Sequence, residues 1–233
     1  WGPAFTLSGT TLALAMMAYG FIASVIPVWL ILAPRDYLST FLKIGTIIAL
    51  AIGILIVMPD MKMPALTEFA STGMGPVWKG GLFPFLFITI ACGAVSGFHA
   101  LIASGTTPKL LASESHTRYI GYGGMLMESF VAIMALVAAS VIEPGVYFAM
   151  NSPAALVGSD VQSVATAVSS WGFTITPGEL EAVAADIGEN TILARAGGAP
   201  TLAVGIAQIL HQVLPGQNTM AFWYHFAILF EAL

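Results

Sequence analysis

Long, almost uninterrupted apolar stretches dominate this chain of 233 residues. A membrane-crossing helix needs about 20 mostly apolar residues, because the hydrocarbon core is about 30 Å thick and a helix rises about 1.5 Å per residue. Four stretches meet this requirement and a fifth begins after them, at residues 6–33, 38–58, 82–104, 120–142 and 218–233. The pattern predicts an all-α fold: a polytopic transmembrane helical bundle with four full spans and a truncated fifth.

Two features mark the junction of the first two predicted spans. Pro27 removes one backbone hydrogen bond, so we expect a kink in the first span at this position. Arg35 and Asp36 are expected in the tight turn that follows. An adjacent ion pair in such a turn is usually a structural clamp, and the alternative is a role in a cytoplasmic gate.

A more polar stretch, residues 143–217, separates the fourth and fifth predicted spans and holds half of the twelve acidic residues. Valines at helical spacing over 161–168, and a capping box that begins at Thr176, predict two short amphipathic helices here. Residues 200–214 are apolar but too short to span alone, so we expect a re-entrant or interface-lying segment. The stretch is therefore predicted to be an insertion outside the membrane.

Basic residues in short loops predict the orientation of the spans. Arg35, Lys43, Lys109 and Arg118 flank one side, and the short loop on the other side carries only Lys62 and Lys79. Because short cytoplasmic loops are enriched in Lys and Arg, the first set is expected in the cytoplasm. The insertion at 143–217 is then extracytoplasmic.

The composition excludes several classes of protein. Hydrophobic residues make up 58% of the chain and charged residues 8%, with a mean hydropathy of +0.89, which excludes a water-soluble globule. The net charge of -5 without a basic stripe excludes nucleic acid as an expected partner. The single cysteine and the four histidines show no metal-ligand spacing, and no catalytic or nucleotide-binding motif is present. We therefore expect no enzyme, no metal and no bound cofactor.

The third predicted span carries the first candidate site. Small and hydroxyl-bearing residues surround a histidine, which is typical of a helix that unwinds in the membrane to expose backbone groups to a substrate. The alternative is a packing face formed by Gly93 and Gly97. The predicted substrate-binding or translocation residues are Ser96, Gly97, His99, Ser104, Thr106 and Thr107.

Glu128 carries the second candidate function, because it lies near the centre of the fourth predicted span. A carboxylate is costly to ionise at that depth, so Glu128 is a candidate carrier of a coupling proton. The alternative is a hydrogen-bonded glutamate that only ties helices together. His225 and Glu231 form a weaker candidate set on the truncated span, and Lys109 joins Arg35 and Asp36 as a candidate cytoplasmic gate residue.

Three motifs resemble a known family. They are APRDYLSTFLK at 33–43, SGFHALI with SGTTPK over 96–109, and AFWYHF at 221–226. Together they closely resemble the carbon starvation protein A family of bacterial inner-membrane carriers. The resemblance implies that this chain is an internal fragment of a larger polytopic protein. It also implies import of peptides or of pyruvate with protons under nutrient limitation.

The residues and the resemblance together favour a secondary active transporter for a small nutrient, either a peptide or pyruvate, in the bacterial inner membrane. A proton is the favoured coupling ion, with sodium as the alternative. The expected partners are this substrate, the lipid bilayer and the remainder of the same polypeptide. A membrane-embedded nutrient sensor with an extracytoplasmic binding insertion is the alternative function. An intramembrane enzyme would need paired catalytic groups, which the sequence does not offer.

Overall fold

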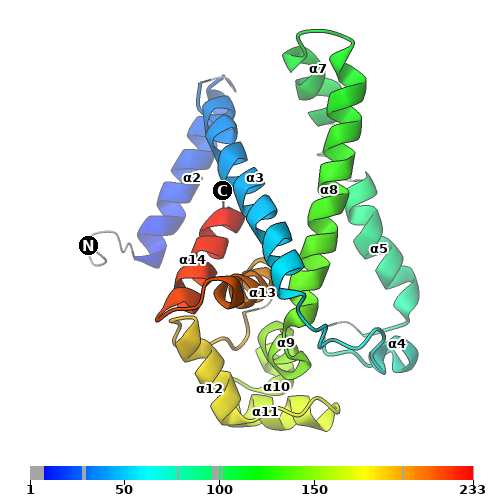
Figure 1. Ribbon diagram of the computed structural model, residues 1–233, viewed down its shortest axis with the longest axis vertical. Coiled ribbons are helices and arrows are strands. Elements are labelled where there is room, and N and C mark those ends of the chain that lie inside the picture. The colour runs from blue at the N-terminus through cyan, green and yellow to red at the C-terminus, as the bar shows by residue number, and fades with distance from the viewer. Residues whose placement is uncertain are drawn as a thin grey trace. The chain divides into compact units, whose positions relative to one another are not determined.

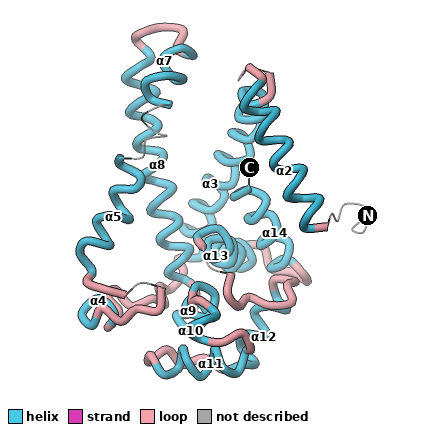
Figure 2. The backbone as a smooth tube through the Cα atoms, turned by 180° about the vertical axis from the view of Figure 1, so that it is seen from behind, coloured by secondary structure: helices cyan, strands magenta, loops and turns pink. Residues whose placement is uncertain are grey.

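The computed structural model describes residues 8–27, 30–77, 79–95, 100, 102–195 and 197–232. Helices and connecting loops make up this described part, which contains no β-strand, only an isolated antiparallel bridge between Met74 and Lys79 (Figures 1 and 2). The predicted all-α class is therefore confirmed for these residues. The chain divides into two units, the first ending at Ile48 and the second running from Ala49 to Ala232.

The first unit contains helix α2 (Gly9–Val25) and the beginning of α3 (Leu32–Val57). Ser8 caps α2 by accepting a hydrogen bond from the backbone N–H of Thr11 at 3.3 Å. The kink predicted within a continuous span at residues 6–33 is wrong, because α2 ends before Pro27. Ile26 has the extended conformation (φ -80°, ψ 145°) that the residue before a proline prefers, and Pro27 has no N–H with which to continue the helix.

Helix α3 begins six residues earlier than its predicted start at residue 38. Pro34 and Arg35 therefore lie in its first turn and Asp36 directly follows them in the helix, so that none of the three lies in the turn between spans. A proline is tolerated at this position because the N–H groups of the first turn have no partner within the helix. The segment Ala33–Val57 is long and apolar enough to cross a membrane.

The next part of the chain contains four short elements: α4 (Phe69–Thr72), α5 (Leu82–Val95), the π-helix η1 (Ile102–Thr106) and α7 (Thr107–Leu110). Phe83 has a non-helical conformation because it precedes Pro84. Between Ser104 and Pro108 the described backbone passes from a π-helical turn into α7. A local widening to a π-helix can accommodate a proline that lacks an N–H.

Helix α8 (His116–Val141) corresponds to the fourth predicted span and extends it at the N-terminal end by one turn. It is the second helix of the described chain that is long and apolar enough to cross a membrane. Helices α2 and α5, with 17 and 14 residues, are shorter. The structure thus supports two candidate spans and one shorter apolar helix.

The predicted insertion is helical in the structure and includes α9 (Pro144–Asn151), α10 (Ala154–Val157), α11 (Val161–Ser170) and α12 (Pro177–Asp186). The predicted capping box is present: Thr176 accepts from the backbone N–H of Glu179, and Glu179 accepts from the N–H of Thr176. Aromatic rings of Phe69, Phe148 and Phe173 lie 4.6–6.0 Å apart and join α4 to the insertion.

Helix α13 (Gly198–Val213) is the central helix of the second unit, and α14 (Thr219–Ala232) follows it. In Figure 1, α13 lies beside α8, α9 and α14, and eight of its residues are buried. Its interior position follows from small side chains such as Ala203, Gly205 and Ala207, which permit close approach of neighbouring helices. The segment at 200–214 is thus helical and packed among its neighbours, and its predicted re-entrant or interfacial position stays a prediction.

Candidate functional site

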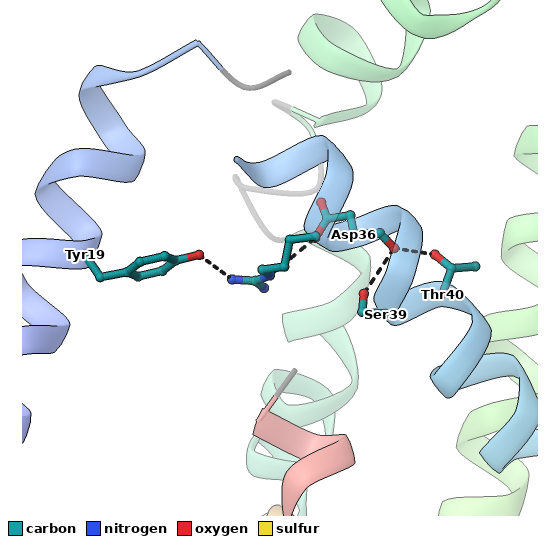
Figure 3. A network of polar contacts seen from close by, with 5 residues as sticks. Tyr19, Asp36, Ser39 and Thr40 are labelled. Atoms are coloured by element: carbon teal, nitrogen blue, oxygen red, sulfur yellow. Dashed lines mark hydrogen bonds and ion pairs between the residues drawn. The ribbon is translucent and has the colours of Figure 1, made fainter. Parts of the chain in front are cut away.

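Polar side chains at the start of α3 form the network shown in Figure 3. Arg35 Nη1 donates a hydrogen bond to Tyr19 Oη of α2 at 3.1 Å. Arg35 Nε lies 3.8 Å from a carboxylate oxygen of Asp36, and both side chains are exposed. The carbonyl of Asp36 accepts from the hydroxyls of Ser39 and Thr40 at 3.1 and 2.7 Å. The two gate candidates of the first unit are thus brought together, and Tyr19 is a member of the network that the sequence did not reveal.

Glu128 lies at the midpoint of α8, as the span prediction requires. Its side chain is exposed on the surface of the described helices and makes no hydrogen bond or ion pair with another described residue. A glutamate in the middle of a membrane-crossing helix needs a polar partner or a water-filled cavity. Among the described residues, the Glu128 side chain therefore has neither a partner nor a covering neighbour.

His225 of α14 has a carboxylate partner that sequence reasoning missed. Its Nε2 lies 3.9 Å from Glu189 Oε1, while Glu189 Oε2 accepts from Arg195 Nη2 at 2.8 Å. His225 Nδ1 lies 2.8 Å from the carbonyl of Ala221 and must donate to it, because a carbonyl only accepts. The other ring nitrogen, Nε2, is the one that faces the Glu189 carboxylate.

Glu231, six residues further along α14, lies away from Glu189 and lines a cavity. It faces a cavity of about 490 Å³ between α8, α9, α13 and α14. Two polar residues of this cavity, Asn151 and Thr201, are joined by a 2.9 Å hydrogen bond from Asn151 Nδ2 to Thr201 Oγ1. The structure does not bring His225 and Glu231 together as one proton-binding pair, since each has its own set of neighbours.

The predicted translocation residues divide between described and undescribed parts of the chain. Ser96, Gly97 and His99 lie outside the described residues. Ser104 lies in the π-helix η1, where its hydroxyl donates to the carbonyl of Ala100 at 2.7 Å. Thr106, Thr107 and Lys109 lie at the junction of η1 with α7, and Lys109 is exposed. A π-helical turn is frequent at functional sites, so Ser104 and Thr106 stay candidate functional residues.

Together the described helices combine a mid-helix carboxyl group, a histidine–carboxylate pair and polar residues that line a cavity. No three His, Cys, Asp or Glu side chains within the described ranges gather closely enough to hold a metal ion. The groups that are present can bind and release protons and offer hydrogen bonds to a polar solute. Such helices and side chains define the general class as an α-helical membrane protein with protonatable groups along its helices.

Comparison with known proteins narrows this class. Residues 1–233, the whole chain, match the family model described as carbon starvation protein CstA, and the chain belongs to this family. The resemblance of the three motifs is therefore confirmed. No solved structure matches the chain.

Several curated relatives match over the full chain. It is 66% identical to "Peptide transporter CstA" of Escherichia coli strain K12 and 61% identical to "Pyruvate/proton symporter BtsT" of the same strain. It is 43% identical to "Peptide transporter CstA" of Bacillus subtilis strain 168. The match covers 100% of this chain in each case, and 34%, 35% and 36% of these relatives. The chain thus spans about a third of the length of the curated relatives that it matches.

Proposed function

We propose that this chain is part of a secondary active transporter that imports a small nutrient, a peptide or pyruvate, across the bacterial inner membrane. The observation that carries this proposal is the identity of 61–66% over the whole chain with relatives named as a peptide transporter and a pyruvate/proton symporter. The proton is the proposed coupling ion, with sodium as the alternative. No catalytic activity and no bound cofactor are part of the proposal.

The proposed topology is multi-pass. Helices α3 and α8 have the length and hydropathy of spans, and we propose that α2, the region from α5 to α7, and α14 also enter the membrane as part of the complete protein. Residues 143–217, with helices α9 to α13, form the proposed extracytoplasmic insertion, in which 200–214 is the possible re-entrant segment. The basic residues of the short loops on the opposite side support this orientation.

The proposed substrate path runs along the interrupted third span, from Ser96, Gly97 and His99 to the hydroxyl-bearing turn. The π-helical turn at Ile102–Thr106 supports this proposal, because it departs from regular α-helical hydrogen bonding at the residues whose hydroxyls are proposed to contact the substrate. The proposed path residues beyond it are Ser104, Thr106 and Thr107. Arg35, Asp36 and Lys109 are proposed gate residues at the cytoplasmic ends of their helices.

Three residues are proposed to handle the coupling proton. Glu128 is the first, because it is a carboxyl group at the midpoint of an apolar helix. His225 is the second, with the Glu189 carboxylate 3.9 Å from its Nε2, and Glu231 is the third, because it lines a cavity that a solute can occupy. A proton that binds one of these groups on one side of the membrane and leaves on the other drives uptake.

Uptake by right-side-out vesicles tests the proposal. Vesicles that contain the full-length protein are supplied with labelled pyruvate or labelled dialanine, and internal label is measured against vesicles without the protein. A transporter accumulates at least one of the two substrates. A nutrient sensor binds its ligand at the insertion and accumulates neither, so that absence of internal label for both would contradict the proposal.

A further inference from the structure

The second unit contains a polar cavity of about 590 Å³, lined in part by residues of the predicted insertion. The loop after α3, the end of α12, the last turns of α13 and the start of α14 form its walls. Its volume lies in the range of small-molecule binding sites. Its polar and charged lining residues include Asp60, Lys62, Asp186, Gln208, His211 and Asn218.

The charges of this cavity leave two carboxylates available. Asp60 and Asp186 are exposed, and neither forms an ion pair or hydrogen bond with another described residue. The one lysine of the lining, Lys62, already has a carboxylate partner, since its Nζ lies 2.8 Å from Glu143 Oε1. The cavity therefore has a surplus of negative charge.

Its uncharged groups also offer acceptors. Gln208 Oε1 is buried and accepts no hydrogen bond, which is costly for an amide oxygen unless a donor arrives. The hydroxyl of Thr219 donates to the carbonyl of Gly216 at 2.9 Å, so it must accept from His211 Nδ1 at 2.6 Å. The neutral His211 ring then presents Nε2 as a further acceptor. A ligand that fits this cavity brings positive charge and several N–H donors.

We propose that this cavity binds the protonated N-terminal amino group of a peptide substrate, with Asp60 and Asp186 as the charged partners. The inference rests on the proposed transport function and refines it, because it favours peptides as the substrate class. A peptide brings an ammonium group with three N–H donors. Pyruvate has no amino group and carries a negative charge that these carboxylates repel.

The test compares substrates with and without a free amino group. Full-length protein is reconstituted in proteoliposomes, and initial uptake rates of dialanine, N-acetyl-dialanine and pyruvate are measured over a range of concentrations. The variants are Asp60→Asn, Asp186→Asn and the double variant. The matched control is Glu181→Gln, which removes one negative charge from an exposed position of the same helix as Asp186 but outside the cavity.

Each single variant is expected to raise the KM for dialanine about tenfold, the contribution of one hydrogen bond to a charged group. The KM for N-acetyl-dialanine and for pyruvate, if they are carried, does not rise, because neither has an ammonium group and both carry a negative charge, and the control behaves as wild type. An unchanged KM for dialanine, or an equal rise for all three substrates, overturns the inference. If the wild-type protein accumulates pyruvate but not dialanine, the inference about the cavity is overturned and the transport proposal stands. If it accumulates neither substrate, both are overturned.

Discussion

Gly205 of α13 lies directly against the backbone carbonyl of Ala138 in α8. A Cβ atom placed on Gly205 would come within 2.0 Å of that oxygen and 2.6 Å of its carbon. Both residues lie in the interior of the second unit, where Ala138 and the neighbouring Val204 and Ile206 are buried. The candidate span α8 and the central helix α13 are thus in backbone contact, so neither helix can shift at this crossing without the other.

This contact predicts that Gly205→Ala destabilises the protein. A backbone atom cannot move aside as a flexible side chain does, so the helices must separate, and overpacking of this kind costs about 1–3 kcal/mol. We expect a lower thermal unfolding midpoint for the full-length protein in detergent. Gly198→Ala in the same helix is the control, since a Cβ there meets nothing within 4 Å. Equal midpoints for the two variants would show that the crossing is not as close as described.

The orientation of the insertion gives a second prediction. A cysteine at Ser159, exposed between α10 and α11, is introduced into a protein that lacks Cys92. It should react with a membrane-impermeant thiol reagent added to intact cells, because the insertion is expected outside. A cysteine at the exposed Ser113, before α8, is the matched control and should react only after the cells are opened. The reverse pattern would invert the topology.

Local signals in the sequence predicted the local features of this fold well. The capping box at Thr176 and Glu179 needs only residues three apart in the chain, and both of its hydrogen bonds are present. Helix α8 follows from one continuous apolar stretch. Pro27 was identified as a point of disruption, but its effect was underestimated, because Ile26 adopts an extended conformation and the helix ends.

Features that depend on distant parts of the chain could not be predicted in this way. Glu189 is 36 positions from His225, and only the packing of α14 beside the loop after α12 brings them together. The cavity that Glu231 lines depends on four helices. The burial of α13 was missed as well, because its 16 residues are too few to span a membrane and the pattern alone does not show which helices surround it.

The N-cap of α11 gives a prediction about pH. Ser163 donates to the Asp160 carboxylate from its hydroxyl and its backbone N–H, at 2.6 and 2.8 Å, and these hydrogen bonds hold the pKa of Asp160 below its ordinary value of 3.8. Because the pKa is lower in the folded state, the stabilisation is complete above the ordinary value and is lost as pH falls through the folded value. Asp160→Ala should therefore speed amide exchange in α11 at pH 6.

The difference in the amide exchange rate of α11 between Asp160→Ala and wild type should narrow as the pH falls below 3.8, because the wild-type carboxylate then becomes protonated. Hydrogen–deuterium exchange of full-length wild type and full-length Asp160→Ala, recorded at each pH, measures this difference. Glu181→Ala, at an exposed site of α12 that caps no helix, is the control and should leave α11 unchanged. A difference that is constant from pH 6 to pH 3 would exclude the carboxylate as its cause.

Glu128→Gln tests the proposed proton carrier. Glutamine keeps the size and the hydrogen-bonding groups of the protonated acid but cannot release a proton. We expect uphill accumulation to be lost while exchange of internal for external substrate persists, since exchange needs no net proton movement. The matched control, Glu114→Gln in the exposed loop before α8, should accumulate substrate normally. Normal proton-driven accumulation by Glu128→Gln would shift the role to Glu231 or His225.

Proton-driven import is the central property that we propose for this protein, and uptake under an imposed pH gradient measures it most directly. Full-length protein in proteoliposomes is given labelled pyruvate or dialanine with an acidic exterior, with and without sodium. We predict accumulation above the external concentration that needs no sodium and collapses when a protonophore removes the gradient. Uptake that ignores the pH gradient and appears only with a sodium gradient, or no accumulation of either substrate, would contradict proton-coupled import.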